Sequence, residues 1–229
     1  MAGLREELAR AERFVESCLP HELIKVFAME AGTLFGVRSP AYVVGVETVQ
    51  AEKSPRRDAD EYRTVDLERV ELESAEYDLV LCCNVLEHTS RPLATLPSFR
   101  QGLKAGGLIV IMVPNVVSLK GLVTRLTPHP VHRWYFRRIV GRSPDLAPAP
   151  GLHSLSLRPR SLRRHASESG WQIEYWRIYE GGMQKSLRYR LGVVGWRWRL
   201  VVVLTRVLSL GLVTAEGTGV IAVLSKTLD

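Results

Sequence analysis

Apolar residues recur at regular spacing through most of the chain, and the spacing predicts alternating helices and strands. Residues 4–18 place apolar side chains three and four positions apart, which predicts an amphipathic helix that ends near Pro20. Residues 24–29 and 41–47 are short and almost continuously apolar. Such runs are typical of strands that are buried on both faces of a parallel sheet.

The middle of the chain predicts a strand, a helix and a second strand with short connections. Residues 77–84 form the clearest apolar run. Ser90 is a suitable N-cap for a helix that runs to about Lys104, and two glycines at 106–107 end it before a strand at 108–113. This order is typical of a right-handed crossover in an α/β sheet. Further strands are expected at residues 62–65, 171–179 and 218–226, and further helices at 116–140, 160–169 and 182–210.

The chain of 229 residues has a formal net charge of +7, and the charge is unevenly distributed. Acidic residues crowd residues 58–78, and basic residues crowd residues 133–206. A basic half suits an anionic substrate, an anionic membrane surface or nucleic acid as a partner, and a solvated basic face explains it equally well. No defined nucleic-acid motif accompanies the charge, so nucleic acid is the least favoured of these partners.

The sequence favours a reducing compartment. Of three cysteines, Cys82 and Cys83 are adjacent in an apolar run, and we expect them to be small core residues rather than part of a disulfide framework. The N-terminal residues contain no apolar signal segment. Residues 200–213 are apolar, but Arg206 interrupts them and they are too short to cross a bilayer. We therefore expect a cytoplasmic protein.

The residues that follow the predicted strands form the candidate site, because ligands of open α/β sheets bind outside the carboxyl ends of the strands. Glu47 ends the second strand, where a carboxylate can accept hydrogen bonds from both hydroxyls of a ribose; an exposed glutamate at a strand end is the plainer alternative. Asp66 follows the third strand and can accept the amino group of adenine, or serve as a turn or cap residue. The other two positions are the turn at residues 30–36 and the segment 84–88.

Several blocks of the sequence carry the pattern of one family. Residues 77–88, YDLVLCCNVLEH, resemble the fourth conserved block of class I S-adenosylmethionine (SAM) dependent methyltransferases, in which F/Y-D-L-V precedes L-E-H. Residues 103–107, LKAGG, look like the following L-x-P-G-G block, and residues 113–115, VPN, resemble the P-N at the end of the fifth strand. Residues 42–47 resemble the second strand with its ribose-binding acid. The motifs cover residues 20–118, and the rest of the chain matches more loosely.

The resemblance implies an α/β fold with a Rossmann-like, doubly wound, mostly parallel seven-stranded sheet, helices on both faces and an antiparallel C-terminal strand. It implies a single domain over residues 1–229, with insertions at 116–150 and 180–212 that form a lid or acceptor side. It also implies methyl transfer from the cofactor S-adenosyl-L-methionine to a small or lipid-like organic acceptor, at oxygen, nitrogen or carbon. The acceptor attacks in line, and the protein supplies positioning and electrostatic stabilisation. The cofactor-binding residues it implies are Glu30, Gly32, Glu47, Asp66, Asn84 and Val85.

The first conserved block of the family departs from its usual form, E/D-x-G-x-G-x-G. Residues 30–36 read EAGTLFG, with Gly32 as the one glycine close to a recognisable place. Glycine is needed in such a loop where φ is positive or where a side chain would collide with the cofactor. The helix that normally follows is almost absent, because Pro40 and the next strand arrive soon. Either SAM still binds to a remodelled loop, or its binding is weak or lost and the chain is a scaffold with another role, non-catalytic or a different reaction.

Three residues are candidates for catalysis. His88 lies at the rim after the fourth predicted strand, where it can act as a base, orient the acceptor or simply cap a helix. His132 and Tyr135 lie in the run TPHPVHRWYFRR, whose prolines, aromatics and arginines suit a lid or acceptor wall. Histidine is a suitable base because its ordinary pKa lies near neutrality. No metal site is expected, because the histidines lack companion carboxylates at ligand spacing.

Residues 188–208, RYRLGVVGWRWRLVVVLTRVL, combine arginines and tryptophans with an apolar run. This pattern suits an interfacial helix that touches lipid or a lipid-like substrate, and hence peripheral membrane contact. A helix packed on the sheet or at an oligomer interface has the same pattern, and this is the favoured interpretation.

Overall fold

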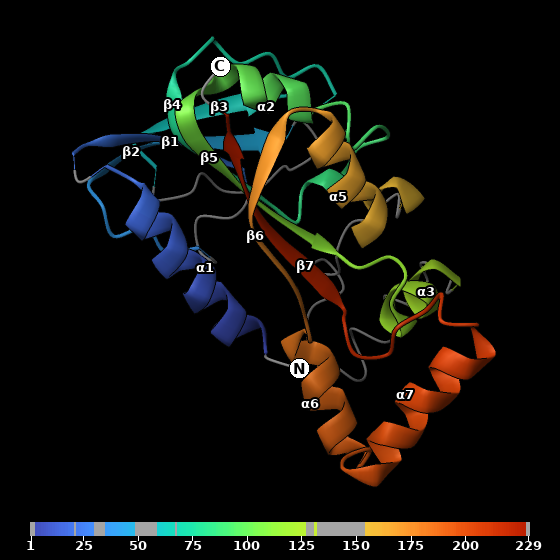
Figure 1. The fold of residues 1–229 in the computed structure, drawn as a ribbon. Helices are drawn as coiled ribbons and strands as arrows, with labels where there is room; N and C mark the ends of the chain where they lie inside the picture. The colour runs from blue at the N-terminus through green and yellow to red at the C-terminus, as the bar shows by residue number, and fades with distance from the viewer. Residues whose placement is uncertain are drawn as a thin grey trace.

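The structure is a computed structural model that describes residues 3–20, 22–29, 35–48, 59–66, 68–126, 131 and 154–227; of residues 47, 48, 124 and 125 it describes the backbone alone. Seven strands form one sheet in the order β3-β2-β1-β4-β5-β7-β6 (Figure 1). The strands are β1 (Ile24–Met29), β2 (Ala41–Thr48), β3 (Glu61–Val65), β4 (Tyr77–Cys83), β5 (Leu103–Pro114), β6 (Trp171–Tyr179) and β7 (Gly219–Lys226). The first five are mutually parallel, and β7 runs antiparallel between β5 and β6. The predicted fold class is therefore confirmed.

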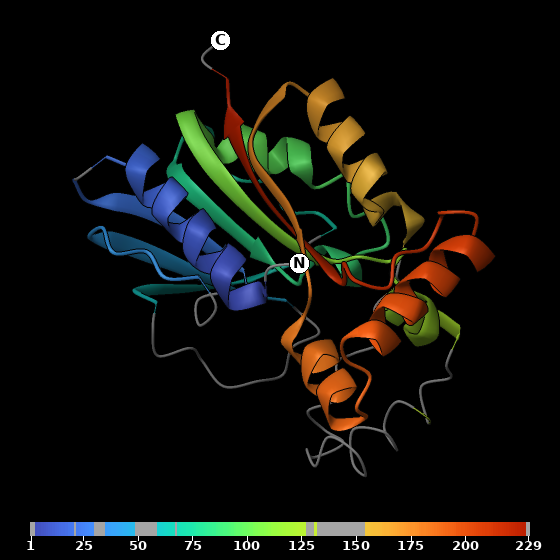
Figure 2. The ribbon, with the colours of Figure 1, turned by 60° about the horizontal axis from the view of Figure 1, so that its bottom comes forward.

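Helices cover both faces of the sheet (Figure 2). On one face lie α2 (Leu96–Gly102) and α5 (Pro159–Glu168), whose buried residues join a core with Phe27 and Tyr77, two rings packed edge to face at 5.2 Å. On the other face α1 (Leu4–Cys18) buries Ala11 and Val15 against the sheet. Because both faces of β1, β4 and β5 are buried, the sequences of these strands are almost continuously apolar.

The prediction of a helix from Ser90 to Lys104 is wrong in its bounds, because the observed helix is shorter. The chain after β4 forms a short 3-10 helix, η1 (Leu86–His88), then turns, and only then α2. Pro97 lies in the first turn of α2, which is the part of a helix where a missing N–H costs nothing. The helix also ends early, at Gly102, where a Cβ would lie 2.6 Å from the Cβ of Leu72.

The two glycines at 106–107 do not end a helix but lie within β5. Gly106 has a φ of 73°, and the register with β4 shifts there, since Tyr77 pairs with Leu103 and Leu79 with Leu108. The glycine therefore permits an irregular stretch of the strand.

The single C-terminal helix predicted over residues 182–210 is two helices, α6 (Gly182–Arg190) and α7 (Trp196–Leu208). Gly192 and Gly195 between them have positive φ, at 65° and 57°, which ends one helix and redirects the chain into the next. Of the helices predicted over residues 116–140, the structure describes α3 (Leu119–Leu126). The short 3-10 helix η4 (Leu155–Leu157) leads into α5.

Phe99 of α2 tests the core beneath this face of the sheet. Its ring is fully buried, so Phe99→Ala should lower the free energy of unfolding by about 3–5 kcal/mol through lost apolar burial and the cavity left behind. Leu23→Ala is the control, since Leu23 is 69% exposed and its truncation should change stability by about 0.5 kcal/mol or less. Equilibrium urea denaturation measures both, and a loss below about 1 kcal/mol for Phe99→Ala would contradict the packing.

Candidate functional site

The carboxyl ends of β1, β2 and β4 lie level at one edge of the sheet. Met29 at the end of β1 pairs with Val46 of β2 and with Cys82 of β4. Glu47 follows Val46 directly, and Asn84 comes two residues after Cys82. The chain leaves β1 toward β2 and β3 on one side, and β4 lies on the other side. This reversal between β1 and β4 is the switch point at which open α/β sheets bind ligands.

Asn84 makes the turn out of β4. Its φ is 55°, and its backbone N–H donates to the carbonyl oxygen of Met112 on β5 at 2.8 Å. The chain then enters η1, where the N–H of His88 donates to the carbonyl of Val85 at 2.9 Å. Asn84 and His88 are half-buried at the rim, whereas the side chain of Val85 is buried in the core. Val85 as a whole is only 1% exposed, so Asn84 and His88 are the residues of this turn whose surface reaches the rim.

A buried cluster that the sequence analysis did not single out lies behind this turn. Glu87 of η1 is buried, and Tyr179 at the end of β6 lies near it. Burial raises the pKa of Tyr179 to about 12, and the neighbouring Cys83 and Glu87 add to the rise, so the phenol keeps its proton at neutral pH. Gly219 leaves room for this ring, since a Cβ there would lie 2.4 Å from it. The only sign of this cluster in the sequence is Glu87, an acidic residue that follows two apolar residues shortly after a buried strand.

The segment after β1 is tied to α1. Glu30 and Gly32 lie outside the described residues, and the part that the structure describes, residues 35–40, contains no helix. Phe35 is buried, the N–H of Gly36 donates to Glu12 at 2.8 Å, and the hydroxyl of Ser39 donates to Glu16 at 2.9 Å. The carboxylates of α1 thus hold the connection in place.

Burial would by itself raise the pKa of Glu16. Hydrogen bonds from Arg38 and Ser39 outweigh it, and the pKa lies below its ordinary value. The carboxylate is therefore charged at neutral pH, as its role as an acceptor requires.

Of the remaining predicted site residues, Asp66 alone has a side chain that the structure describes. Asp66 is exposed and has turn geometry, because its Oδ1 accepts from the N–H of Glu68 at 3.0 Å. The backbone of Glu47 pairs with Thr64, and its side chain lies outside the description. His132 and Tyr135 also lie outside the described residues. The roles predicted for all of these residues, and for His88, stay predictions.

Asp78 and Asn115 belong to the motifs that resemble the family, and both make hydrogen bonds that link neighbouring strands. Asp78 accepts from the backbone N–H of Lys25 and from the ammonium of Lys104, both at 2.8 Å, at the amino ends of β1 and β4. Asn115 is buried and donates to the carbonyl of Gly217 at 2.7 Å, which ties the end of β5 to the start of β7. Both side chains therefore hold the sheet together.

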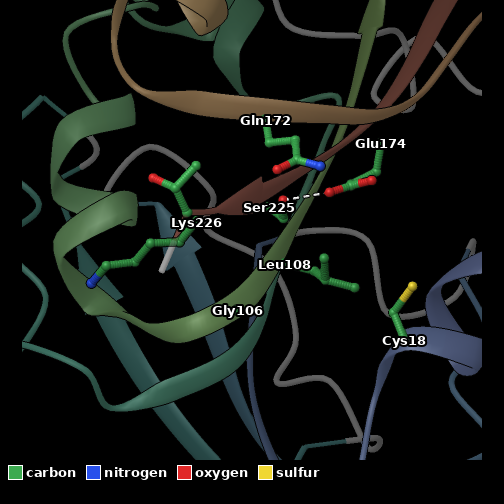
Figure 3. A pocket seen from close by; sticks show the side chains of 8 residues that line it. Cys18, Gly106, Leu108, Gln172, Glu174, Ser225 and Lys226 are labelled. Atoms are coloured by element: carbon green, nitrogen blue, oxygen red, sulfur yellow. Dashed lines mark hydrogen bonds between the residues drawn. The ribbon is translucent and has the colours of Figure 1, made fainter. Parts of the chain in front are cut away.

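A cavity of about 460 Å³ lies away from the switch point (Figure 3). It opens at the amino ends of β5 and β6, and there the hydroxyl of Ser225 donates to Glu174 at 2.7 Å. The described parts of the chain hold no group of three or more histidine, cysteine, aspartate or glutamate side chains that suits a metal ion.

Residues 22–175 match the profile of a family described as "Methyltransferase domain". A ubiquinone biosynthesis O-methyltransferase of Cereibacter sphaeroides is 28% identical over an alignment of 147 residues, and the match covers 55% of this chain and 59% of that protein. The chain thus spans about three fifths of the length of the curated relative.

Three solved structures have a similar fold at low sequence identity. An S-adenosylmethionine dependent methyltransferase from Mesorhizobium loti matches with a TM-score of 0.55 and 16% identity, over 98% of this chain and 100% of that one. A SAM-dependent methyltransferase from Methanosarcina mazei matches with 0.53 and 11%, over 94% and 98%. The cyclase SpnF matches with 0.54 and 13%, over 100% and 84%. These likenesses concern the fold alone.

Asn84 tests the turn that forms the rim of the site. Asn84→Ala should lower the free energy of unfolding by about 1 kcal/mol, because alanine tolerates positive φ less well than asparagine does. Asn84→Gly is the matched control and should keep the stability within about 0.5 kcal/mol, since glycine adopts this φ freely. Urea denaturation compares the two variants, and equal losses would mean that the backbone conformation at Asn84 is not the constraint.

Proposed function

Because the chain belongs to the methyltransferase-domain family, we propose that it transfers a methyl group from S-adenosyl-L-methionine to a small or lipid-like organic acceptor. The observation that carries the proposal is the level register of β1, β2 and β4, which brings Glu47 and Asn84 to the switch point.

The residue types at this edge fit the cofactor. A carboxylate at Glu47 would hold the ribose through its two hydroxyls, and Asp66 would accept the adenine amino group. Asn84 would offer an amide from the other side of β1, and Glu30, Gly32 and Val85 would line the rest. When bound, the cofactor supplies a methyl group on a sulfonium, so the chain needs no nucleophile of its own.

The protein's part is then positioning. It must hold the acceptor in line with the methyl group and exclude water from the gap. Where the accepting atom carries a proton, a base is needed, and His88 at the rim is the described candidate. His132 and Tyr135 are the other two.

The acceptor is proposed to be apolar in part. Exposed apolar residues gather on α3, α6 and α7, and these helices follow the carboxyl ends of β5 and β6. We treat residues 116–150 and 180–212 as acceptor-side insertions of one domain over 1–229. The name of the curated relative, a ubiquinone biosynthesis O-methyltransferase, supports oxygen as the accepting atom.

Titration with SAM and with its demethylated product S-adenosylhomocysteine tests the proposal. Both should bind at one site, and Glu47→Ala should weaken binding by more than about tenfold, since it removes charge-assisted hydrogen bonds worth about 1.5–3 kcal/mol. Glu61→Ala is the control. Glu61 begins β3, so it lies at the end of that strand away from Asp66, and its loss should leave the affinity unchanged. If neither ligand binds at high micromolar concentration, the proposal is wrong.

A scaffold without methyl transfer is the second candidate. The altered block at residues 30–36 favours it, and SpnF shares the fold while bearing the name of a cyclase. A nucleoside released when the purified protein is denatured would speak for a bound cofactor and against this candidate. Protein that carries none and binds none would support it.

A further inference from the structure

A surface of apolar and basic residues lies at the same edge of the sheet as the candidate site. Residues 182–212, called here the α6–α7 arm, comprise α6, α7 and the turn after α7. The arm links β6 to β7, and because β5 and β6 both run antiparallel to β7, it leaves the sheet at the edge where β5 ends. Thr214, just past the arm, pairs with Ser118 beside α3. The arm and α3 therefore flank the same edge of the sheet (Figures 1 and 2).

The arm packs loosely on the rest of the protein. The structure describes every residue of α6 and α7, and none of them is buried. At about 100° per residue, the half-buried Trp198, Val201, Val202 and Thr205 share the inner face of α7. The outer face is centred on Trp196, Leu200, Val203 and Val207. An exposed helix face made of tryptophan, leucine and valine side chains is typical of a surface that binds an apolar partner.

The turn after α7 continues this apolar surface. Leu208, Leu210 and Leu212 are 82%, 90% and 72% exposed. Leu210 has a φ of 51°, a conformation that residues other than glycine rarely adopt. The turn is ordered by Ser209, whose hydroxyl donates to the carbonyl of Thr205 at 2.6 Å and accepts from the N–H of Val213 at 3.1 Å. The last residue of α7 and the ordered turn after it thus present three leucines to solvent, which suits insertion into an apolar layer.

The charge of the arm has one sign. Residues 182–212 contain six basic residues and no aspartate or glutamate. Arg188 is structural, because it pairs with Glu180 at 2.6 Å and stacks on Trp198 at 5.0 Å, which holds the arm to the end of β6. The other five form no ion pair with any residue that the structure describes: Lys185, Arg190, Arg197, Arg199 and Arg206.

The arginines of α7 border its apolar face. By helical position, Arg199 and Arg206 lie along one flank of the outer face and Arg197 lies along the other. An apolar face between two basic flanks is the pattern of a helix that lies in the interface of an anionic bilayer. Among the described segments no helix has both the length and the apolar character to span a membrane.

We propose that the α6–α7 arm docks the protein on an anionic lipid surface, with the apolar face and the leucine turn in the acyl boundary and the arginines at the phosphates. The edge of the sheet with Glu47 and Asn84 then faces the membrane, and a lipid-like acceptor enters from it; this last point rests on the proposed function. A symmetric contact between two copies is disfavoured, because it would set the arginines of one arm against those of the other.

Vesicle sedimentation with the full chain tests the docking. Vesicles of phosphatidylglycerol and phosphatidylcholine should bind the protein more than tenfold more tightly than vesicles of phosphatidylcholine alone. Arg199→Ala with Arg206→Ala should weaken binding about 25-fold, about fivefold for each arginine. Leu208→Ser with Leu210→Ser should weaken it as well. The matched control is Arg160→Ala with Arg164→Ala, which removes the same charge from exposed positions of α5 and should change nothing.

Three results would overturn the docking: equal binding to both kinds of vesicle, equal losses for the arm variant and the α5 variant, or a concentration-dependent dimer that Leu208→Ser abolishes. The last would assign the arm to an interface between copies. Titration of the arginine variant with S-adenosylhomocysteine should match the parent protein. Vesicle binding by a protein that fails to bind this ligand would remove the methyltransferase proposal and leave the docking in place.

Discussion

The parallel pairing of β1 with both β2 and β4 is the constraint on which the rest of the molecule depends. It sets Met29, Val46 and Cys82 level, so that the chain leaves three neighbouring strands at one edge. Parallel strands need cover on both faces, which requires the helices on each side. The position of Glu47 and Asn84 follows from this register rather than from any contact between the two residues.

The shortened connection after β1 shows how the sheet stays covered when a loop changes. Its described part, residues 35–40, forms no helix. The N-terminal helix α1 packs Ala11 and Val15 on that face, and its Glu12 and Glu16 accept hydrogen bonds from the connection. The helix α1 therefore both covers this face of the sheet and holds the described part of the connection in place.

Much of the fold was predictable because buried strands and amphipathic helices have strong local patterns. The bounds of α1, β1 and β6 agree with the predicted ranges 4–18, 24–29 and 171–179. The extent of α2 was not predicted, because the position of Pro97 within a helix depends on where the helix starts. The division of α6 from α7 depends on the backbone conformation of two glycines, which the apolar spacing does not report.

The candidate site was predictable only in part, because sequence patterns report local structure and not contacts between distant segments. Residues that follow strands, such as Asn84, can be found by counting from the apolar runs. The approach of Tyr179 to Glu87 joins positions far apart in the sequence and required the antiparallel β7 to be in place. The sequence likewise suggested that Asp78 marks a family, while its contacts with Lys25 and Lys104 show what the side chain does.

The central claim is that the carboxyl edge of β1, β2 and β4 still accepts an adenosyl group despite the altered block at residues 30–36. A crystal structure of the protein with S-adenosylhomocysteine tests it most directly. The account predicts the ribose hydroxyls within hydrogen-bond distance of the Glu47 carboxylate and the ligand beside the Asn84 turn. An adenosyl group bound at another edge of the sheet, or crystals that take up none at millimolar concentration, would contradict it.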